Sequence, residues 1–127
     1  MDKIKSYKDL IVWQKSINLT VEIYKLTKKL LKDELYSLSN QMRRAAVSAS
    51  SNIAEGQARK YFKEFVNFIS IAQGSIAELE TQLILCIRLD YLTEENTSYA
   101  LSILYEVSKM LAALIKKLQT NHLATGH

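Results

Sequence analysis

The clearest structural signal lies between Phe62 and Leu89, where the sequence reads FKEFVNFISIAQGSIAELETQLILCIRL. Apolar residues recur along this stretch every three or four positions, at Phe65, Ile69, Ala72, Ile76, Leu79, Leu83 and Cys86. That spacing places them on one face of an α-helix, because the helix repeats every 3.6 residues. The stretch therefore predicts a long amphipathic helix that buries this face.

Three other stretches show the same spacing. One runs from Asp9 to about Leu31, one from about Tyr36 to Arg59, and the last follows Thr93. Asp9 and Thr93 are predicted N-caps, because their side-chain oxygens can accept a hydrogen bond from an early backbone N–H. The connecting segments are short, so neighbouring helices must run antiparallel. We predict an all-α fold, an antiparallel up-down-up-down four-helix bundle.

The composition agrees with a single helical domain. The chain has 127 residues, no proline and three glycines, so it has few of the residues that form β-hairpin turns or glycine-rich phosphate loops. A hydrophobic fraction of 48% is too high for a disordered protein. We predict one domain over residues 1–122, in which residues 1–8 form an N-terminal arm, followed by a frayed tail over residues 123–127.

Residue types that carry catalysis or hold cofactors are scarce. The two histidines, His122 and His127, lie near the C-terminus and outside any Glu-x-x-His motif, so no di-iron, zinc or haem site is predicted. The sequence contains no phosphate-binding loop, dinucleotide-binding motif or nucleophile elbow. We therefore expect a protein that is not an enzyme and that needs no cofactor.

The single cysteine bears on the cellular compartment. Cys86 cannot form an internal disulfide, which fits a reducing compartment, and its place on the apolar face predicts a buried thiol. The sequence has no run of eighteen apolar residues and no hydrophobic signal core near Met1. We expect a cytoplasmic protein that does not enter a membrane.

The second predicted helix carries a polar stripe as well as an apolar one. Its members are three or four residues apart and are Gln41, Arg44, Ser48, Asn52, Glu55 and Arg59. Short Ser and Asn side chains on this face suit the close approach of another surface. We predict that five of these residues form an oligomer interface: Gln41, Arg44, Ser48, Asn52 and Glu55. The alternative is a solvated helix face with a Glu55–Arg59 ion pair of little energetic value.

Small residues predict close helix packing at two places. In the second helix they are Ala45, Ala46, Ser48, Ala49, Ser50 and Ser51. In the third helix, Gly74 costs about 1 kcal/mol relative to alanine, and we expect a close helix crossing at Gly74 and Ser75 to compensate. Glu78 is expected to meet Arg43 or Arg44 across the bundle.

Basic residues exceed acidic ones, with 17 Lys and Arg against 13 Asp and Glu and a net charge of +4. This excess permits nucleic-acid binding without requiring it. Two clusters are candidate phosphate contacts: Lys25, Lys28, Lys29 and Lys32 near the end of the first helix, and Arg59, Lys60 and Lys63 around the second loop. We expect them at opposite ends of the bundle, so that an oligomer would be needed to align several clusters. Ordinary solvated lysines are the alternative.

Aromatic residues are expected to serve packing. Tyr36, Tyr61 and Tyr91 fall at predicted helix ends, where their rings can cover the core while the hydroxyl groups stay in water. Stacking on RNA bases is the alternative for these rings. Trp13 is expected to pack in the core of the bundle.

Four sequence motifs, in this order along the chain, resemble those of one protein family. They are YKDLIVWQK from Tyr7, QMRRAAVS from Gln41, SNIAEG from Ser51 and AQGSIAELET from Ala72. The chain is similar over nearly its whole length to the four-helix-bundle family of proteins encoded in intervening sequences of 23S ribosomal RNA. The polar motif positions that carry over have no catalytic role attached: Arg43, Arg44, Asn52, Glu55 and Arg59, with Trp13 and Gln14 of unassigned role.

The resemblance implies a four-helix bundle that assembles as a barrel-like homopentamer. One branch of the family is the accessory protein of diversity-generating retroelements, which partners a reverse transcriptase and contacts nucleic acid. Our first hypothesis is therefore a homo-oligomeric bundle, not an enzyme, that binds RNA or a nucleic-acid enzyme through its basic surface. The second is a structural or protein-binding oligomer with no nucleic-acid role.

Overall fold

The computed structural model describes residues 6–30 and 35–125. Within these residues the chain forms four α-helices: α1 (Ile11–Thr27), α2 (Tyr36–Ala58), α3 (Phe62–Arg88) and α4 (Glu94–Thr125). A short 3-10 helix, η1 (Tyr7–Asp9), precedes α1, and a second, η2 (Lys28–Leu30), follows it. The predicted all-α fold is confirmed, and the predicted bounds of α2 and α3 agree with the observed ones to within one residue.

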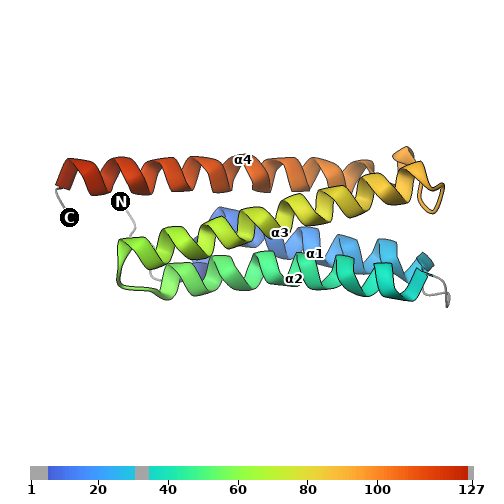
Figure 1. Cartoon of the computed structure of the whole chain (residues 1–127), viewed down its shortest axis with the longest axis horizontal. Helices are drawn as coiled ribbons and strands as arrows, with labels where there is room; N and C mark the ends of the chain where they lie inside the picture. Colours follow the sequence, from blue (N-terminus) through green and yellow to red (C-terminus); the bar gives the residue numbers. More distant parts are fainter. Residues whose placement is uncertain (1–5, 31–34, 126–127) are drawn as a thin grey trace.

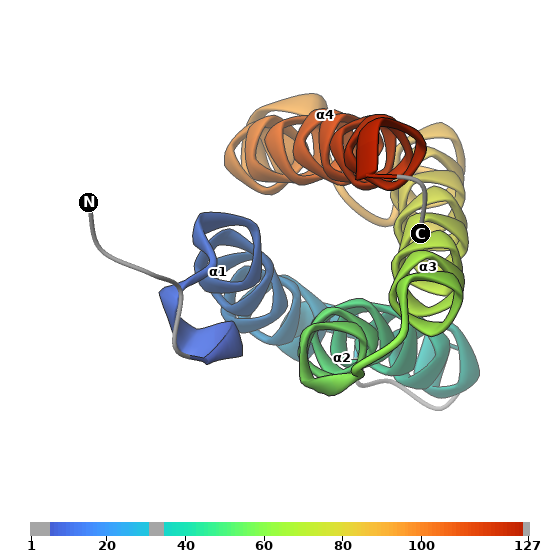
Figure 2. The same cartoon turned by 90° about the vertical axis from the view of Figure 1, so that its left-hand side faces the viewer.

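The helices lie side by side as an elongated antiparallel bundle (Figure 1). Each helix packs against the next one in the sequence, and α4 packs against α1 to close the bundle. Seen from the end, α2 lies opposite α4 and α1 opposite α3 (Figure 2). The C-terminal end of α4 extends past the first turn of α1 at this end of the bundle (Figure 1).

The core follows the predicted periodicity. Six of the seven apolar positions predicted for α3 are fully buried, and only Phe65 is half-buried. The largest buried side chains from the other helices include Leu19, Ile23, Met42, Ile53, Leu104 and Leu111. Burying one side chain of this size stabilises the fold by about 1.5–3 kcal/mol, so the apolar stripes fix which faces of the helices meet.

The start of α1 differs from the prediction. Asp9 belongs to η1, where its carboxylate accepts a hydrogen bond from the Ser6 N–H at 3.2 Å. The N-cap of α1 is Leu10, in extended backbone and without a side-chain cap. The Gln14 side-chain amide donates to the Lys8 carbonyl at 2.8 Å and ties η1 to α1. The predicted Asp9 cap is wrong because Asp9 and Ser6 cap the short turn instead.

The other predicted cap is confirmed. Thr93 Oγ1 accepts a hydrogen bond from the Asn96 N–H at 3.0 Å, and Asn96 Oδ1 accepts one from the Thr93 N–H at 3.0 Å. This reciprocal pair satisfies backbone donors that the first turn of α4 leaves open. The first helix, in contrast, ends as an α-helix at Thr27 rather than near Leu31, and its chain tightens there into η2.

The chain ends are only partly described. Residues 1–5 of the predicted arm and residues 126–127 of the predicted tail lie outside the described residues. Tyr7 lies in the part of the arm that the structure describes, and its ring packs edge-on against Trp13, with ring centroids 5.1 Å apart. Helical backbone continues to Thr125, into the segment predicted to fray.

The close helix crossing expected at Gly74 lies elsewhere. Gly74 is on the exposed side of α3, and a Cβ atom added there would meet nothing within 4 Å. It is two residues from buried Ile76, and this spacing directs it away from the core. A Cβ atom at Gly56 would instead lie 3.1 Å from both Phe65 Cδ1 and Phe68 Cβ. The close approach of α2 and α3 is therefore at Gly56, and the prediction for Gly74 is wrong.

Helix α4 is long and apolar enough to span a membrane by length and composition alone. In the structure its apolar stripe packs inside the bundle, where Ala100, Ile103, Leu104, Val107 and Leu111 are buried against α1 and α3. A core helix of a helical bundle meets the same criterion, and packing within this fold accounts for these five buried residues.

Candidate functional site

The polar stripe of α2 borders a groove between α2 and α3. A hollow of about 320 Å³ is lined there by Gln41, Arg44, Ala45, Ser48, Ser75 and Glu78. The Ser48 and Ser75 hydroxyl groups share a hydrogen bond of 2.9 Å and join the two helices at the edge of the hollow. We call this surface, together with exposed Gly74, the α2–α3 face.

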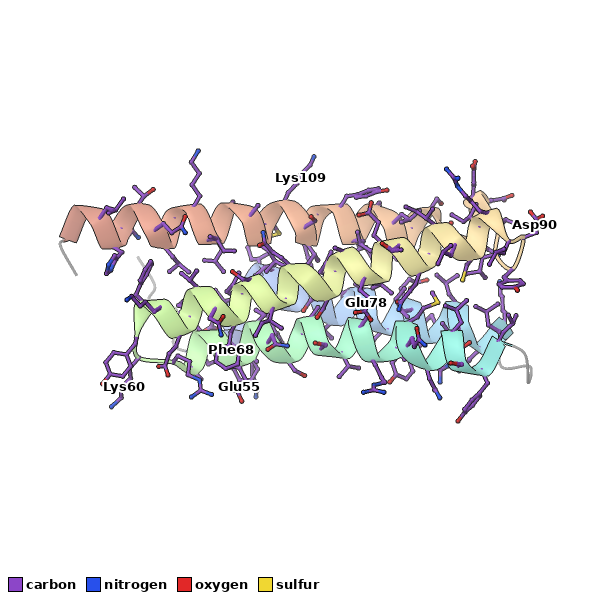
Figure 3. The ribbon with its side chains drawn as sticks, viewed as in Figure 1. Glu55, Lys60, Phe68, Glu78, Asp90 and Lys109 are labelled. Atoms are coloured by element: carbon purple, nitrogen blue, oxygen red, sulfur yellow. The ribbon has the colours of Figure 1, made fainter. Side chains whose placement is uncertain are left out.

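Opposite charges line this hollow without pairing. Arg44 and Glu78 both border it, yet no ion pair joins them within the described part of the chain. Glu78 instead accepts a weak hydrogen bond of 3.4 Å from the Gln82 side chain. Figure 3 shows Glu78 on the side of α3 that faces α2. Both charges therefore remain available to another molecule.

Arg43 does not reach Glu78, contrary to the prediction. Its Nε donates to Thr27 Oγ1 at 2.8 Å and its Nη2 to the Tyr24 carbonyl at 3.2 Å, both near the C-terminal end of α1. The guanidinium group also lies over the Tyr24 ring, 4.4 Å from its centroid. Arg43 therefore joins α2 to α1, and a cation at a helix C-terminus is stabilised by the helix dipole.

The remaining members of the predicted interface bond within their own chain. Asn52 Nδ2 donates to the Ser48 carbonyl at 2.8 Å, one turn earlier on α2. Glu55 forms an exposed ion pair with Arg59 at 2.9 Å, and the Arg59 guanidinium lies over the Phe68 ring. The structure thus separates the stripe into an open part, with Gln41 and Arg44, and an internally bonded part.

The small residues of α2 serve packing inside the chain. Ala45, Ala46, Ala49 and Ser50 are buried. Thr20 Oγ1 from α1 lies 3.2 Å from both the Ala46 carbonyl and Ser50 Oγ. The predicted close approach of a neighbouring helix is therefore made by α1.

The two basic clusters lie at opposite ends of the bundle, as predicted. Lys25, Lys28 and Lys29 are exposed where α1 and η2 end, and Lys25 forms a loose pair with Glu22 at 3.8 Å. Arg59, Lys60 and Lys63 surround the loop between α2 and α3 at the other end. Lys32 lies outside the described residues.

One feature of the second cluster was not predicted from the sequence. The C-terminal part of α4 brings His122 against this loop, where its ring stacks on Phe62 with centroids 4.0 Å apart. The signal was indirect, since antiparallel helices joined by short loops place the end of α4 beside the start of α3. Tyr61 was expected to cover the core, but its side chain is 70% exposed.

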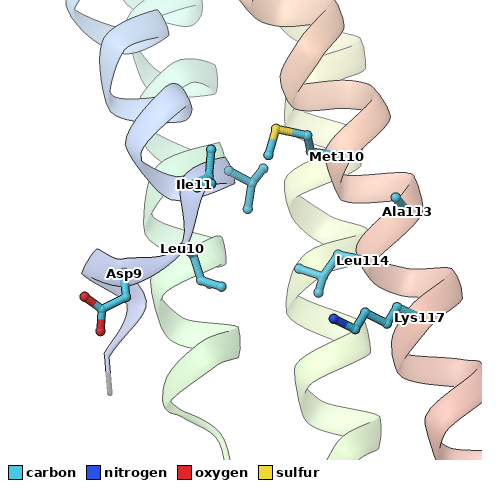
Figure 4. A pocket seen from close by; sticks show the side chains of 8 residues that line it. Asp9, Leu10, Ile11, Met110, Ala113, Leu114 and Lys117 are labelled. Carbon is cyan, nitrogen blue, oxygen red and sulfur yellow. The ribbon is translucent and has the colours of Figure 1, made fainter. Parts of the chain in front are cut away.

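An apolar hollow of about 350 Å³ separates the first turn of α1 from α4. Leu10, Met110 and Leu114 line it, the Lys117 side chain borders it, and the Asp9 carboxylate points away (Figure 4). This cleft lies where the first turn of α1 runs alongside residues 110–117 of α4. It was not predictable from hydrophobic spacing, which does not reveal where α1 begins.

Cys86 is buried, as predicted. Its thiol lies 3.8 Å from Met42 Sδ, and burial raises the pKa of the thiol above its usual value. No group of three or more His, Cys, Asp or Glu side chains in residues 6–30 and 35–125 is placed to hold a metal ion. The expectation that the protein needs no cofactor stays a prediction.

Comparison with known proteins places the chain in a family. Residues 8–113 match the family described as 23S rRNA-intervening sequence protein. The chain belongs to this family. It is similar to the crystal structure of a protein with unknown function from the S23 ribosomal protein family of Bacteroides thetaiotaomicron, with 31% sequence identity and a TM-score of 0.79. That similarity covers 84% of this chain and 99% of the other. No match to this chain was found among curated proteins.

The resemblance to the 23S rRNA-intervening sequence proteins is therefore confirmed. Neither of the two descriptions names a catalytic activity. The matched residues include all of α1, α2 and α3 and end within α4, before His122. The α2–α3 face thus lies inside the region shared with the family, whereas His122, which stacks on Phe62 beside the second basic cluster, lies beyond it.

Proposed function

We propose that this 23S rRNA-intervening sequence protein is not an enzyme, that it assembles with copies of itself through the α2–α3 face, and that it binds RNA through its basic ends. The observation that carries the proposal is the open hollow where Arg44 and Glu78 lie unpaired. An unpaired charge of each sign at one surface suits a partner that offers the complementary pair. Gly74 adds an open position where a neighbouring chain can approach the backbone.

The family resemblance suggests a ring of five copies. In a cyclic ring of five, each contact joins two different surfaces, because a two-fold contact closes at two copies. The α2–α3 face runs along the side of the elongated bundle, whereas the basic clusters lie at its two ends. Bundles packed side by side would repeat each cluster around an opening of the ring. Such repetition converts a modest charge per copy into a strong phosphate-binding surface.

Substitution at Gly74 tests the assembly. Gly74→Arg should leave the fold intact, since a Cβ atom there meets nothing within 4 Å and the position is exposed, but should block a neighbouring copy. We expect the molar mass from light scattering to fall to that of one chain while the circular dichroism spectrum is unchanged. Ser108→Arg adds the same group to an exposed position of α4 and should keep the wild-type mass. A wild-type mass for Gly74→Arg would place the contact elsewhere.

RNA binding is tested by fluorescence anisotropy of a labelled structured RNA between about 50 and 200 mM salt. The proposal predicts an affinity that falls steeply with salt, and a shallower slope for the double variant Lys28→Glu, Lys29→Glu. If the RNA stays unbound at the lowest salt, the protein is a structural or protein-binding oligomer. The partner to seek is then a protein, such as the reverse transcriptase that the family resemblance suggests.

A further inference from the structure

The end of the bundle where α2 joins α3 carries a hollow of about 550 Å³. Its lining consists of Lys60, Tyr61, Phe62 and Lys63 from the loop and the start of α3, and His122 from α4. We call these five residues the basic tip. Figure 3 shows Lys60 at the loop between α2 and α3, with Glu55 and Phe68 set back from it toward the middle of the bundle. A hollow of this size falls in the range of small-ligand sites.

Tyr61 is the most exposed of the tyrosines at the helix ends, ahead of Tyr36 at 56% and Tyr91 at 41%. Its side chain is 70% exposed, and it stands between Lys60 and Lys63 in the sequence. Neither lysine forms an ion pair within the described residues. A large ring held in water between two free cations contributes little to packing, so its surroundings favour contact with a ligand that is both flat and anionic.

The wall behind Tyr61 is fixed by packing. The rings of Phe62 and His122 are almost parallel, with 5° between their planes, and this stack ties α4 to the start of α3. On the other side, Arg59 is held by Glu55 and by the Phe68 ring, so its guanidinium group is already engaged. The free cations of the tip are therefore Lys60 and Lys63, and the free aromatic face is that of Tyr61.

We propose that the basic tip is a subsite for an unpaired nucleobase and its flanking phosphates, in which the base stacks on Tyr61 and the phosphates contact Lys60 and Lys63. This inference rests on the proposed RNA binding and specifies which part of the nucleic acid enters the site. Unpaired bases of single-stranded segments can present their faces to a protein ring, whereas in a duplex stacking covers the faces of all but the terminal base pairs. An acidic peptide would use the two lysines but would gain nothing from the tyrosine ring.

The test compares labelled single-stranded and blunt duplex oligonucleotides of equal length in anisotropy titrations of the full chain. We expect the single strand to bind more tightly than the duplex. Tyr61→Ala should weaken single-strand binding at least fivefold, the effect of losing one base stack, without changing the salt slope. Tyr61→Phe should retain the wild-type affinity because it keeps the ring. Lys60→Glu with Lys63→Glu should reduce the slope instead.

Tyr99→Ala is the matched control, because Tyr99 on α4 is 62% exposed but lies outside the basic tip; it should bind like the wild type. Equal binding of Tyr61→Ala and the wild type to the single strand would overturn the stacking subsite while leaving RNA binding itself standing. Failure of all oligonucleotides to bind would overturn the proposed function and this inference together.

Discussion

Arg43 and Arg44 are adjacent in the sequence but face different helices. Arg43 bonds to Thr27 and Tyr24 on α1, whereas Arg44 borders the open hollow beside α3. From the sequence alone the two were interchangeable candidates for pairing with Glu78. The difference comes from their 100° separation around α2, which becomes informative only once the neighbours of each face are known.

The two arginines should therefore differ in their effect on stability. Arg43→Ala should lower the free energy of unfolding by about 1–2 kcal/mol, because it removes hydrogen bonds from a charged donor and a cation–π contact. Arg43→Lys should restore only part of the lost stability, since an ammonium group lacks the planar set of N–H donors of a guanidinium group. Arg44→Ala should change the stability of the single chain by less than about 0.5 kcal/mol. Urea denaturation measures all three, and equal losses for both alanine variants would contradict the assignment.

The two helical glycines should respond in opposite directions. Gly56→Val should destabilise the chain by about 1–3 kcal/mol, because added atoms meet Phe65 and Phe68. Gly74→Ala should stabilise the isolated chain by about 0.5–1 kcal/mol, since it gains helix propensity and meets nothing. Thermal unfolding of the two variants under identical conditions provides the comparison. A loss of stability in Gly74→Ala would show that position 74 is not open.

Cys86 should make the protein sensitive to alkaline pH. Burial raises the pKa of its thiol in the folded state, so above about pH 8.5 the unfolded chain loses this proton while the folded chain keeps it. The contribution is fully present below that pH and is lost as the pH rises toward the folded-state pKa. Urea titrations from pH 7 to 10 should show a steeper loss for the wild type than for Cys86→Ala. Parallel losses would count against the raised pKa.

At the scale of single helices, the ends differ more from the prediction than the middles. The buried positions of α3 and the Thr93 cap could be predicted, because both depend on residues close together in the sequence. The start of α1 was not, because the Asp9 carboxylate bonds to Ser6, which lies before the predicted helix. Short polar residues bond to whichever backbone donor lies near, and the sequence does not specify which one.

The caps supply a prediction for α4. Thr93→Ala should destabilise the protein by about 1 kcal/mol, because the Asn96 N–H loses its acceptor. Asp9→Ala should have a smaller effect, since α1 is not capped by that side chain. The chemical-denaturation midpoints of the two variants give the comparison. A larger loss for Asp9→Ala would mean that η1 contributes more to the fold than the α4 cap does.

For the molecule as a whole, the arrangement of the helices could be predicted from the sequence more fully than the contacts on the surface could. Four amphipathic stripes and short loops leave few ways to bury the apolar faces, so architecture and order were predictable. The polar stripe of α2 was also visible, but its division into an open and an internally bonded part depends on Ser75 and Glu78 from α3. Likewise, the meeting of His122 with Phe62 joins residues 60 positions apart.

The central claim is that copies of this chain assemble side by side and hold RNA at their basic ends. Sedimentation velocity with a labelled RNA, followed through both the protein and the dye, tests it in one measurement. The account predicts that the protein sediments as an oligomer, that the RNA moves with it at low salt, and that high salt releases the RNA while the oligomer persists. RNA that sediments alone at the lowest salt, or a protein that sediments as a single chain, would contradict it.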